Sequence, residues 1–288
     1  MNPTDIFSFF EEHKTKGVDL VLATVCETKG STYSKIGSYM LISNKGLFYG
    51  LLSGGCLEGD LAERAKEVLK NNQSQQVTYD LSQNDDLLWG LGVGCDGLMR
   101  IFLQPLLSKN NYEPFTSIRD NMHANQPGVF VTVIESSDHK NISTSAVGTD
   151  HSFHNFSIQS SLIPIIKKEI LNVIQYKESS LQDIEVDGQA TTVLYTILKP
   201  LPKILILGAG LDAEPIVRMA VELGWRITIQ DHRSAYIEKG NFGAASSVHC
   251  VPVKSLSKEI NLGEFDAAIV MSHHIEADRD YLKILAST

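Results

Sequence analysis

The chain has 288 residues, a formal net charge of −9 and 43% hydrophobic residues. It is long enough for two ordinary domains with hydrophobic cores, and its acidic balance argues against nucleic acid or an anionic membrane surface as a partner. No apolar stretch is long enough to cross a bilayer, and the first residues do not resemble a secretory signal. Four cysteines with neither disulfide nor zinc-site spacing suit a reducing compartment, so we expect a cytoplasmic location.

Hydrophobic periodicity predicts a mixed α/β domain at the start of the chain. Leu57, Leu61, Ala65 and Val68 recur at helical spacing and predict an amphipathic helix over residues 57–70. The other elements expected in this domain, which we place at residues 1–108, are a helix at 4–14 and strands at 20–25, 38–42, 47–52, 77–81 and 98–103.

The middle of the chain, residues 109–198, is expected to continue this domain as a connecting α/β region. The order of strand, polar loop and strand at residues 128–147 echoes the order at 21–41, although this similarity alone does not establish a repeat. Two prolines in the segment 199–202 predict an extended linker. The predicted elements are helices at 115–124 and 162–175 and strands at 128–135, 142–147 and 191–198.

Residues 199–288 have the pattern of a Rossmann-like domain. Strands that alternate with helices predict a parallel, doubly wound sheet with right-handed crossovers. Four strands make little more than half of such a sheet, so we expect the domain to be incomplete at its C-terminus. The strands are expected at 203–207, 226–230, 248–252 and 266–271, and helices at 215–223 and from about 277.

A glycine fingerprint follows the first strand of this domain. Gly208, Gly210 and Ala213 lie between a strand and a helix, and Asp231 ends the next strand, 23 residues after Gly208. In dinucleotide-binding folds the phosphates bind at the helix N-terminus and such an acid binds a ribose hydroxyl. One interpretation is therefore a nucleotide site, where Asp231 favours NAD over NADP and the neighbouring Arg233 weakens that preference. The other is a Rossmann-type fold whose crevice binds something else.

Two histidines, His273 and His274, follow the last strand, where the carboxyl ends of parallel strands line a crevice. They are candidates for a proton shuttle or metal ligands. We favour a polar loop in which one histidine caps a helix, because no second ligand cluster matches them. We therefore assign neither catalytic residues nor a metal site.

Two glycine-rich loops in the first half each carry a cysteine, Cys56 at residues 50–60 and Cys95 at 92–97. Glycines let the backbone approach a ligand, and the helix after the first loop favours an anion and a thiolate at its N-terminus. These loops suit a ligand that combines a phosphate with sulfur or a soft metal. Tight turns with buried cysteines explain the pattern equally well, and Glu58 favours that alternative because it neutralises the helix dipole. Cations that could assist an anion are Lys29, Lys35 and Arg64.

These motifs together resemble the xanthine dehydrogenase accessory-factor family, XdhC/CoxI. Its N-terminal domain is similar to the segments 27–32, 54–58 and 92–97, and its Rossmann domain to 206–210, 223–233 and 271–274. The sequence departs from the family at Tyr33 and Ser34, where a proline and an arginine are common, and at Leu211, where histidine is common. The family chain also continues past His274 with a further strand and helices.

The resemblance implies a maturation factor rather than an enzyme. Family members bind molybdenum cofactor, protect it, and help load its sulfurated form into a molybdenum hydroxylase such as xanthine dehydrogenase. The implied partners are that apoenzyme and a cysteine desulfurase, and an open sheet edge makes a homodimer plausible. The cofactor-binding residues that the resemblance assigns are Gly54, Gly55, Cys56, Glu58, Gly94, Cys95 and Gly97.

Two alternatives remain open from the sequence. The glycine fingerprint allows an NAD-dependent oxidoreductase, although no acid/base pair for hydride transfer is evident in the first half. A scaffold that docks the target enzyme and a desulfurase is the other. If molybdenum cofactor is the ligand, we expect Cys56 and Cys95 to lie on one face of the N-terminal domain, near its cleft with the Rossmann half.

Overall fold

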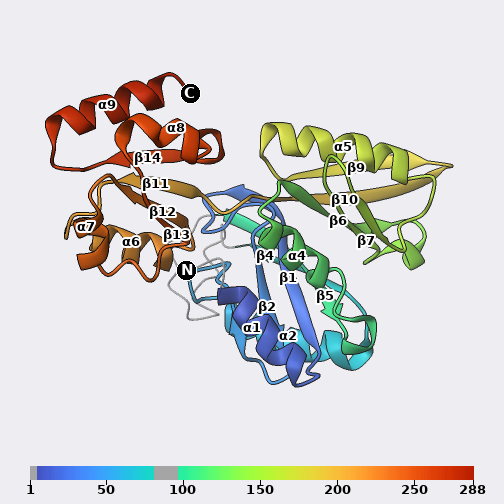
Figure 1. Cartoon of the computed structure of the whole chain (residues 1–288). Helices are drawn as coiled ribbons and strands as arrows, with labels where there is room; N and C mark the ends of the chain where they lie inside the picture. Colours follow the sequence, from blue (N-terminus) through green and yellow to red (C-terminus); the bar gives the residue numbers. More distant parts are fainter. Residues whose placement is uncertain (1–4, 81–96) are drawn as a thin grey trace. The chain divides into compact units, whose positions relative to one another are not determined.

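The computed structural model describes residues 5–80 and 97–288 (Figure 1). Its contacts divide these residues into two compact units, Asp5–Pro200 and Leu201–Thr288. The division falls within the proline-containing segment at 199–202 where we expect a linker. In the part of the chain that the structure describes, no helix combines the length and apolarity that a bilayer crossing needs.

The first unit begins with a five-stranded antiparallel sheet in the order β3-β2-β1-β5-β4. The strand expected at 47–52 covers only Phe48 and Tyr49, because Gly50, with a φ of 114°, turns the chain into the first cysteine loop. The elements are α1 (Asp5–Thr15), β1 (Leu20–Gly30), β2 (Tyr39–Ser43), β3 (Phe48–Tyr49), α2 (Glu58–Asn71), β4 (Gln75–Asp80) and β5 (Gly97–Leu106).

A second sheet in the same unit repeats this arrangement, with the order β8-β7-β6-β10-β9. Each strand and helix has a counterpart in the first sheet, so the unit is an internal repeat. Strands β8 and β9 were not predicted, because they lie at sheet edges, contain many polar residues and have a single buried residue, Ile184, between them. The elements are α4 (Phe115–Ala124), β6 (Gly128–Ser136), β7 (Ser145–Gly148), β8 (Phe153–Phe156), α5 (Ile163–Tyr176), β9 (Ser180–Val186) and β10 (Gln189–Leu198), with short 3-10 helices at Ser108–Asn110 and His139–Asn141.

The repeat extends to single hydrogen bonds in the loops between β1 and β2 and between β6 and β7. Val25 accepts a hydrogen bond from the amide of Gly37, and Val133 accepts the corresponding bond from Ser143. Gly37 and Ser143 both have positive φ, 86° and 71°. The strand pairing also shifts at the same place in both sheets, directly after Val25 and directly after Val133.

The two sheets pack against each other through the residues at these bulges. Cys26 and Phe102 of the first repeat form one buried cluster with their counterparts Ile134 and Leu194 of the second. Helix α2 covers the other face of the first sheet, and α5 covers the other face of the second (Figure 1). The unit therefore has a core between its sheets and one core under each outer helix.

The second unit is a four-stranded parallel sheet in the order β13-β12-β11-β14, with helices on both faces as expected for a doubly wound fold (Figure 1). Ile204 and Ile206 face α6 and α7, whereas Leu205 and Leu207 face α8 and α9. The elements are β11 (Lys203–Leu207), α6 (Ala213–Glu222), β12 (Arg226–Asp231), α7 (Ser234–Lys239), β13 (Ser247–Cys250), α8 (Leu256–Glu259), β14 (Ala267–Val270) and α9 (Ile275–Ala286), with 3-10 helices at Val253–Ser255 and Leu262–Glu264.

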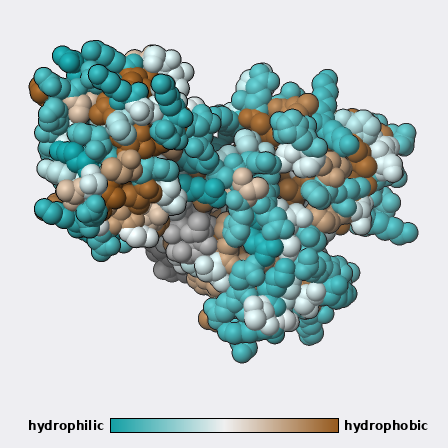
Figure 2. Space-filling view, viewed as in Figure 1, coloured by the Kyte–Doolittle hydropathy of each residue, from teal (hydrophilic) through white to brown (hydrophobic). Residues whose placement is uncertain are grey.

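Most of the surface visible in Figure 2 is hydrophilic, and apolar residues gather on it in separate patches. Large exposed apolar side chains in the first unit include Tyr33 and Leu51, which flank the first cysteine loop. In the second unit they include Leu211 and Ile275, which follow β11 and β14. Apolar surface is therefore present beside both segments that carry the sequence motifs.

The packing between the repeats predicts the effect of a truncation at Leu194, which is 1% exposed. Leu194→Ala removes buried apolar contacts from the cluster that joins the sheets, and we expect it to lower the free energy of unfolding by about 2–5 kcal/mol. Urea denaturation followed by circular dichroism measures this. Leu171→Ala, on the exposed face of α5, is the matched control and should change stability by less than about 0.5 kcal/mol. Equal losses in both variants would contradict the assigned core.

Candidate functional site

The first cysteine loop is shaped by glycines at fixed positions. Gly50 lies against β2, since a Cβ added to it would lie 2.5 Å from the Cβ of Met40. Gly54 and Gly55 have φ values of 79° and 116°, which L residues with a side chain rarely adopt. Leu52 before these glycines is fully buried and anchors the loop to the sheet. The loop is thus a fixed turn between β3 and α2.

A buried carboxylate organises this turn from within. Glu58 begins α2, is 1% exposed, and folds back onto the loop. One carboxylate oxygen accepts hydrogen bonds from the amides of Leu52 and Ser53, at 2.8 and 2.9 Å. The other accepts from the Ser53 hydroxyl at 2.6 Å and the Gly55 amide at 3.0 Å. Glu58, expected as a cofactor contact, is therefore bonded to the loop itself.

The ionised form of Glu58 is favoured in this setting. Burial by itself would raise its pKa, but the hydrogen bonds from Ser53 and from the amides of Ser53 and Leu52 outweigh burial and lower the pKa below the ordinary value. Ser53 was not among the predicted site residues. Its position five residues before Glu58, at the start of a helix, is the sequence signal that identifies it.

Cys56 lies at the open side of the turn. It is a free thiol, half-buried, and packs in part against the core of the first sheet. A Cβ added to Gly55 would meet no described heavy atom within 4 Å, so residues 5–80 and 97–288 leave space next to this cysteine. The ring of Tyr33 covers Gly54, 3.3 Å from the place of an added Cβ, while the Tyr33 side chain remains 62% exposed. Tyr33 was not predicted as a site residue.

The second cysteine loop lies mostly outside the described residues. Gly94 and Cys95 fall in the segment 81–96, so the expectation that Cys56 and Cys95 share one face stays a prediction. Gly97, the first residue of β5, is described, and a Cβ added to it would lie 2.6 Å from the carbonyl oxygens of Lys29 and Ser31. The loop that begins at Ser31 thus contacts Gly97 at one end and, through Tyr33, the first cysteine loop.

Two of the three cations expected near the loops have internal partners. Lys29 pairs with Glu27 at 3.0 Å, and Arg64 pairs with Asp60 at 2.6 Å. No ion pair or hydrogen bond joins the side chain of Lys35 to any described residue. Positive charge is therefore less available at the cysteine loop than the sequence indicated.

The other described cysteine of the first unit is structural. Cys26 is fully buried and its thiol contacts the carbonyl oxygen of Arg100 at 3.3 Å. Burial raises the pKa of this thiol to about 12. Because the thiolate is the reactive form, Cys26 is inert compared with a half-exposed cysteine such as Cys56.

In the second unit the glycine fingerprint follows β11 as predicted, with Ala213 at the first turn of α6. Gly208 has a φ of 131°, and a Cβ there would lie 2.4 Å from the carbonyl oxygen of Met271. Packing between the ends of β11 and β14 therefore requires this glycine. Gly210 lies under Asp212, whose carboxylate pairs with His273 at 2.6 Å.

The structure gives Asp231 partners other than a ribose hydroxyl. Asp231 is fully buried, and its carboxylate accepts hydrogen bonds from the Ala209 amide at 2.8 Å and from the Arg233 guanidinium at 2.9 Å on each oxygen. Burial would raise the pKa of Asp231, but these hydrogen bonds and the Arg233 charge lower it. Arg233 also donates to the carbonyl oxygen of Ser272 at 2.8 Å. The pair therefore ties together the carboxyl ends of β11, β12 and β14.

A histidine cap was favoured from the sequence without a choice between the two histidines, and the structure identifies His274 as the cap of helix α9. Its Nδ1 accepts a hydrogen bond from the amide of Ala277 at 3.3 Å, and His274 is the residue before the helix. His273 pairs with Asp212 and is 67% exposed. Within residues 5–80 and 97–288, no group of three histidine, cysteine or acidic side chains is placed to hold a metal ion.

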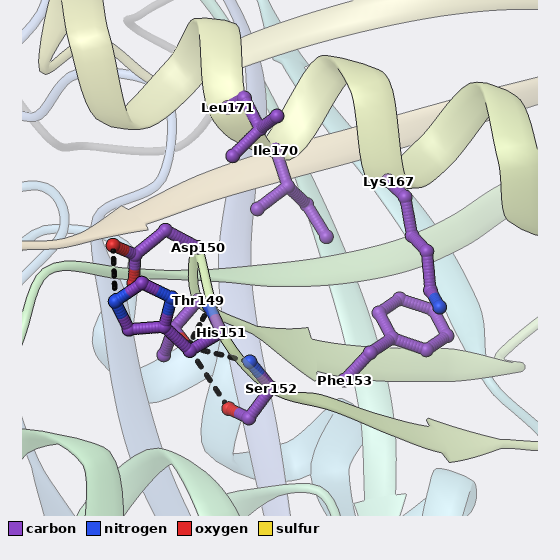
Figure 3. A pocket seen from close by; sticks show the side chains of 8 residues that line it. All are labelled: Thr149, Asp150, His151, Ser152, Phe153, Lys167, Ile170 and Leu171. Carbon is purple, nitrogen blue, oxygen red and sulfur yellow. Dashed lines mark hydrogen bonds and ion pairs between the residues drawn. The ribbon is translucent and has the colours of Figure 1, made fainter.

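A separate hollow of about 280 Å³ lies between the β7–β8 hairpin and α5 (Figure 3). Its charged groups already have partners, since His151 pairs with Asp150 at 3.0 Å and the Lys167 ammonium lies 5.1 Å from the centre of the Phe153 ring. The hollow belongs to the second repeat and contains none of the predicted site residues.

Comparison with known proteins gives two matches to family models. Residues 13–80 match the XdhC and CoxI family, and residues 204–288 match the XdhC Rossmann domain. The first match covers the first cysteine loop, and the second covers the glycine fingerprint through α9. Both lie in the order expected from the sequence.

Similar proteins extend the match over almost the whole chain. The chain is 29% identical over 269 residues to a probable xanthine dehydrogenase subunit of Bacillus subtilis, covering 93% of this chain and 76% of that protein. A crystal structure described as a xanthine dehydrogenase from Bacillus halodurans has a TM-score of 0.73 and 27% identity, and the match covers 99% of this chain and 79% of that one. The molybdenum cofactor insertion chaperone PaoD of Escherichia coli is 30% identical over 74 residues, 26% of this chain and 23% of PaoD. The chain belongs to the XdhC/CoxI family.

Proposed function

We propose that this chain is an accessory factor that binds molybdenum cofactor and delivers it to a molybdenum hydroxylase of the xanthine dehydrogenase type. Membership of the XdhC/CoxI family and the similarity to a molybdenum cofactor insertion chaperone support this proposal. The cofactor is then cargo rather than a resident group. A cytoplasmic location, a cysteine desulfurase as second partner and a homodimer belong to the same proposal.

The main structural support for the proposal is the arrangement of the thiol and the glycine backbone in the first cysteine loop. The cargo presents sulfur, molybdenum and a phosphate, which call for a soft ligand and for amide donors at one place. Cys56 supplies the half-exposed thiol, and Gly54 and Gly55 supply backbone with no side chain in the way. Glu58 occupies the inner amides of the turn, so we place the cargo on the outer side, toward Cys56 and the space beside Gly55.

The contacts of Ser31 and Tyr33 link the two cysteine loops. Gly97 at the end of the second loop lies against Ser31, and Gly54 of the first lies under Tyr33. Both loops thus adjoin one short segment of chain, which supports a shared site that includes Gly94 and Cys95. The exposed aromatic ring of Tyr33 beside this segment suits contact with a planar heterocycle such as a pterin.

Oxidoreductase activity with NAD is not favoured by the second unit. A ribose hydroxyl could bind Asp231 only by displacing its buried pair with Arg233. Asp212 also places a carboxylate at the start of α6, where the pyrophosphate of a dinucleotide would need positive potential. We therefore assign the second unit no dinucleotide and no catalytic residue.

Cofactor binding should depend on Cys56. Cys56→Ala removes the soft ligand, and we expect about tenfold or greater weakening of molybdenum cofactor binding from the loss of this one contact. Fluorescence of the oxidised pterin after gel filtration measures the bound fraction. Cys250→Ala, at an exposed thiol of the second unit, is the matched control and should bind as the parent does. Parent-level binding by Cys56→Ala would remove Cys56 from the site.

The Glu58 carboxylate should contribute pH-dependent stability. Glu58→Gln replaces a charged acceptor of several hydrogen bonds, and we expect a loss of about 1–3 kcal/mol in the free energy of unfolding at pH 7. Because the folded pKa of Glu58 is lowered, its contribution is present above the ordinary value of 4.5 and is lost as the pH falls below it.

The stability difference between parent and Glu58→Gln should therefore shrink on acidification. Chemical denaturation at several pH values from 7 down to about 3, which includes the range below the ordinary pKa, measures it, and Glu63→Gln on the exposed side of α2 is the control. A difference that stays constant across this range would contradict the ionised, hydrogen-bonded carboxylate.

The Asp231–Arg233 pair makes two linked predictions. Asp231→Asn leaves the Arg233 charge without its partner, and we expect a loss of about 3–5 kcal/mol in the stability of the second unit. Titration of the parent with NADH, followed by fluorescence, should show no saturable binding at millimolar concentration. Saturable NADH binding that Asp231→Asn abolishes would restore the oxidoreductase alternative.

A further inference from the structure

We propose that a hollow in the first unit, bordered by Lys35, Lys177 and Lys199, binds a small phosphate-bearing anion. The hollow encloses about 530 Å³ between the β1–β2 loop, the segment after α5 and the end of β10. The proposal is independent of the function proposed above, because it uses none of the residues of the cysteine loop.

The backbone around this hollow is held in a fixed arrangement. A Cβ added to Gly37 would lie 2.3 Å from the Ser179 hydroxyl, so the β1–β2 loop presses directly on the segment that follows α5. The Ser179 hydroxyl accepts a hydrogen bond from the amide of Ile197 at 3.1 Å, which joins that segment to β10. Lys177 ends α5 in a left-handed conformation with a φ of 56°. The three lysines therefore come from three segments that contact one another.

The charges of these lysines are not neutralised within the described chain. None of the three ammonium groups has an ion pair or hydrogen bond to a described residue, in contrast to Lys29 and Arg64, which are paired. Glu178 is the acidic residue among those that line the hollow, and it pairs with none of them. Like charges gathered around one hollow repel each other, and a bound anion with two negative charges relieves that repulsion.

The internal repeat supplies a comparison for this site. The equivalent hollow of about 650 Å³ lies where the β6–β7 loop meets the segment after α2 and the end of β5. In the β1–β2 loop the carbonyl oxygen of Lys35 accepts a hydrogen bond from the amide of Ser38, and in the β6–β7 loop that of Asn141 accepts the equivalent bond from Thr144. Asn141 is therefore the counterpart of Lys35. Lys177 follows α5 and Asn72 follows α2, and both have a left-handed backbone conformation, so these two residues are also counterparts.

The third lysine also has a neutral counterpart. In the first sheet Leu20 pairs with Leu106, and in the second sheet the equivalent residue Gly128 pairs with Leu198. The residues that follow these two partners, Leu107 and Lys199, are therefore counterparts. All three lysine positions are thus neutral in the other repeat, although the loop hydrogen bonds, the helix ends and the strand register correspond. The equivalent hollow contains a single lysine, Lys109, accompanied by Glu113. Because the other repeat folds without lysines at these positions, we attribute the presence of the three lysines to ligand binding.

The lining favours a compact oxyanion over a large ligand. Besides the ammonium groups it offers the hydroxyls of Thr28, Ser38 and Ser179, and its apolar side chains are limited to Ile36 and Ile197 among the described residues. Phosphate and phosphate monoesters match several charged and hydroxyl donors around a small volume. A free phosphate ion and the phosphate group of an ester share this chemistry, and the experiment distinguishes them.

The test compares the parent with a variant that copies the other repeat, Lys35→Asn, Lys177→Asn and Lys199→Leu together. Backbone amide shifts in a two-dimensional NMR spectrum are followed while inorganic phosphate or glycerol 3-phosphate is added at constant ionic strength. The control removes three exposed lysines outside the hollow, through Lys45→Asn, Lys140→Asn and Lys168→Asn. This control has the same net charge as the first variant.

We expect saturable shifts at residues 35–38 and 177–179 in the parent and in the control. The variant that copies the other repeat should bind about tenfold more weakly or not at all, because three charge pairs are lost. A response to glycerol 3-phosphate alone would assign the site to an ester, and a response to both anions to the phosphate group itself. No saturable shift in the parent, or equal weakening in the control, would overturn the proposal. If the triple variant does not fold, the single variant Lys177→Asn replaces it and should bind more weakly than the parent. Parent-level binding by Lys177→Asn, or parent shifts that lie outside residues 35–38 and 177–179, would then overturn the proposal.

Discussion

The carboxylate of Glu58 is the interaction on which the first cysteine loop depends. A turn with two glycines at positive φ has little intrinsic preference for one conformation, and its amides need acceptors. Glu58 supplies these acceptors from the first residue of the following helix, and Ser53 completes the set with its hydroxyl. The position of Cys56 and the open space beside Gly55 follow from this bonding. The loop is therefore preorganised for binding. A ligand does not have to order its backbone, which reduces the conformational entropy that the protein loses on binding.

The internal repeat explains where specific features can develop in the first unit. Two copies of one α/β arrangement pack through equivalent residues, so the interface between the sheets maintains the fold. The loops at the sheet ends are then free to differ. In the first copy, the segment between β3 and α2 has become a glycine-cysteine turn, whereas the segment before α5 contains serines and no cysteine. The three lysines at 35, 177 and 199, whose counterparts are neutral, show the same divergence between the two equivalent hollows.

Much of the fold could be predicted from the sequence, because buried strands and amphipathic helices have strong periodic patterns. The alternation at 203–231 predicted the parallel sheet, and the sequence correctly favoured a helix cap by one of the two histidines at 273–274. The repeat was only faintly visible, since its spacing changes along the chain. Val25 and Val133 are 108 residues apart, whereas their partners Ile101 and Val193 are 92 apart.

The contacts of the site were harder to predict than its location. A sequence shows that Glu58 begins a helix after a glycine turn, but not that the carboxylate folds back to bind that turn. Asp231 has the spacing of a ribose-binding acid, yet Arg233, two residues later, neutralises it in a buried pair. Both cases depend on side-chain direction, which spacing does not determine.

We propose that molybdenum cofactor binds at the first cysteine loop and not at the glycine fingerprint of the second unit. Hydrogen–deuterium exchange with mass spectrometry, on the full chain with and without the cofactor, tests it most directly. We expect slower exchange in peptides that cover residues 50–58 and 31–34, and no change at 208–213. Protection at 208–213 with unchanged exchange at 50–58 would contradict it.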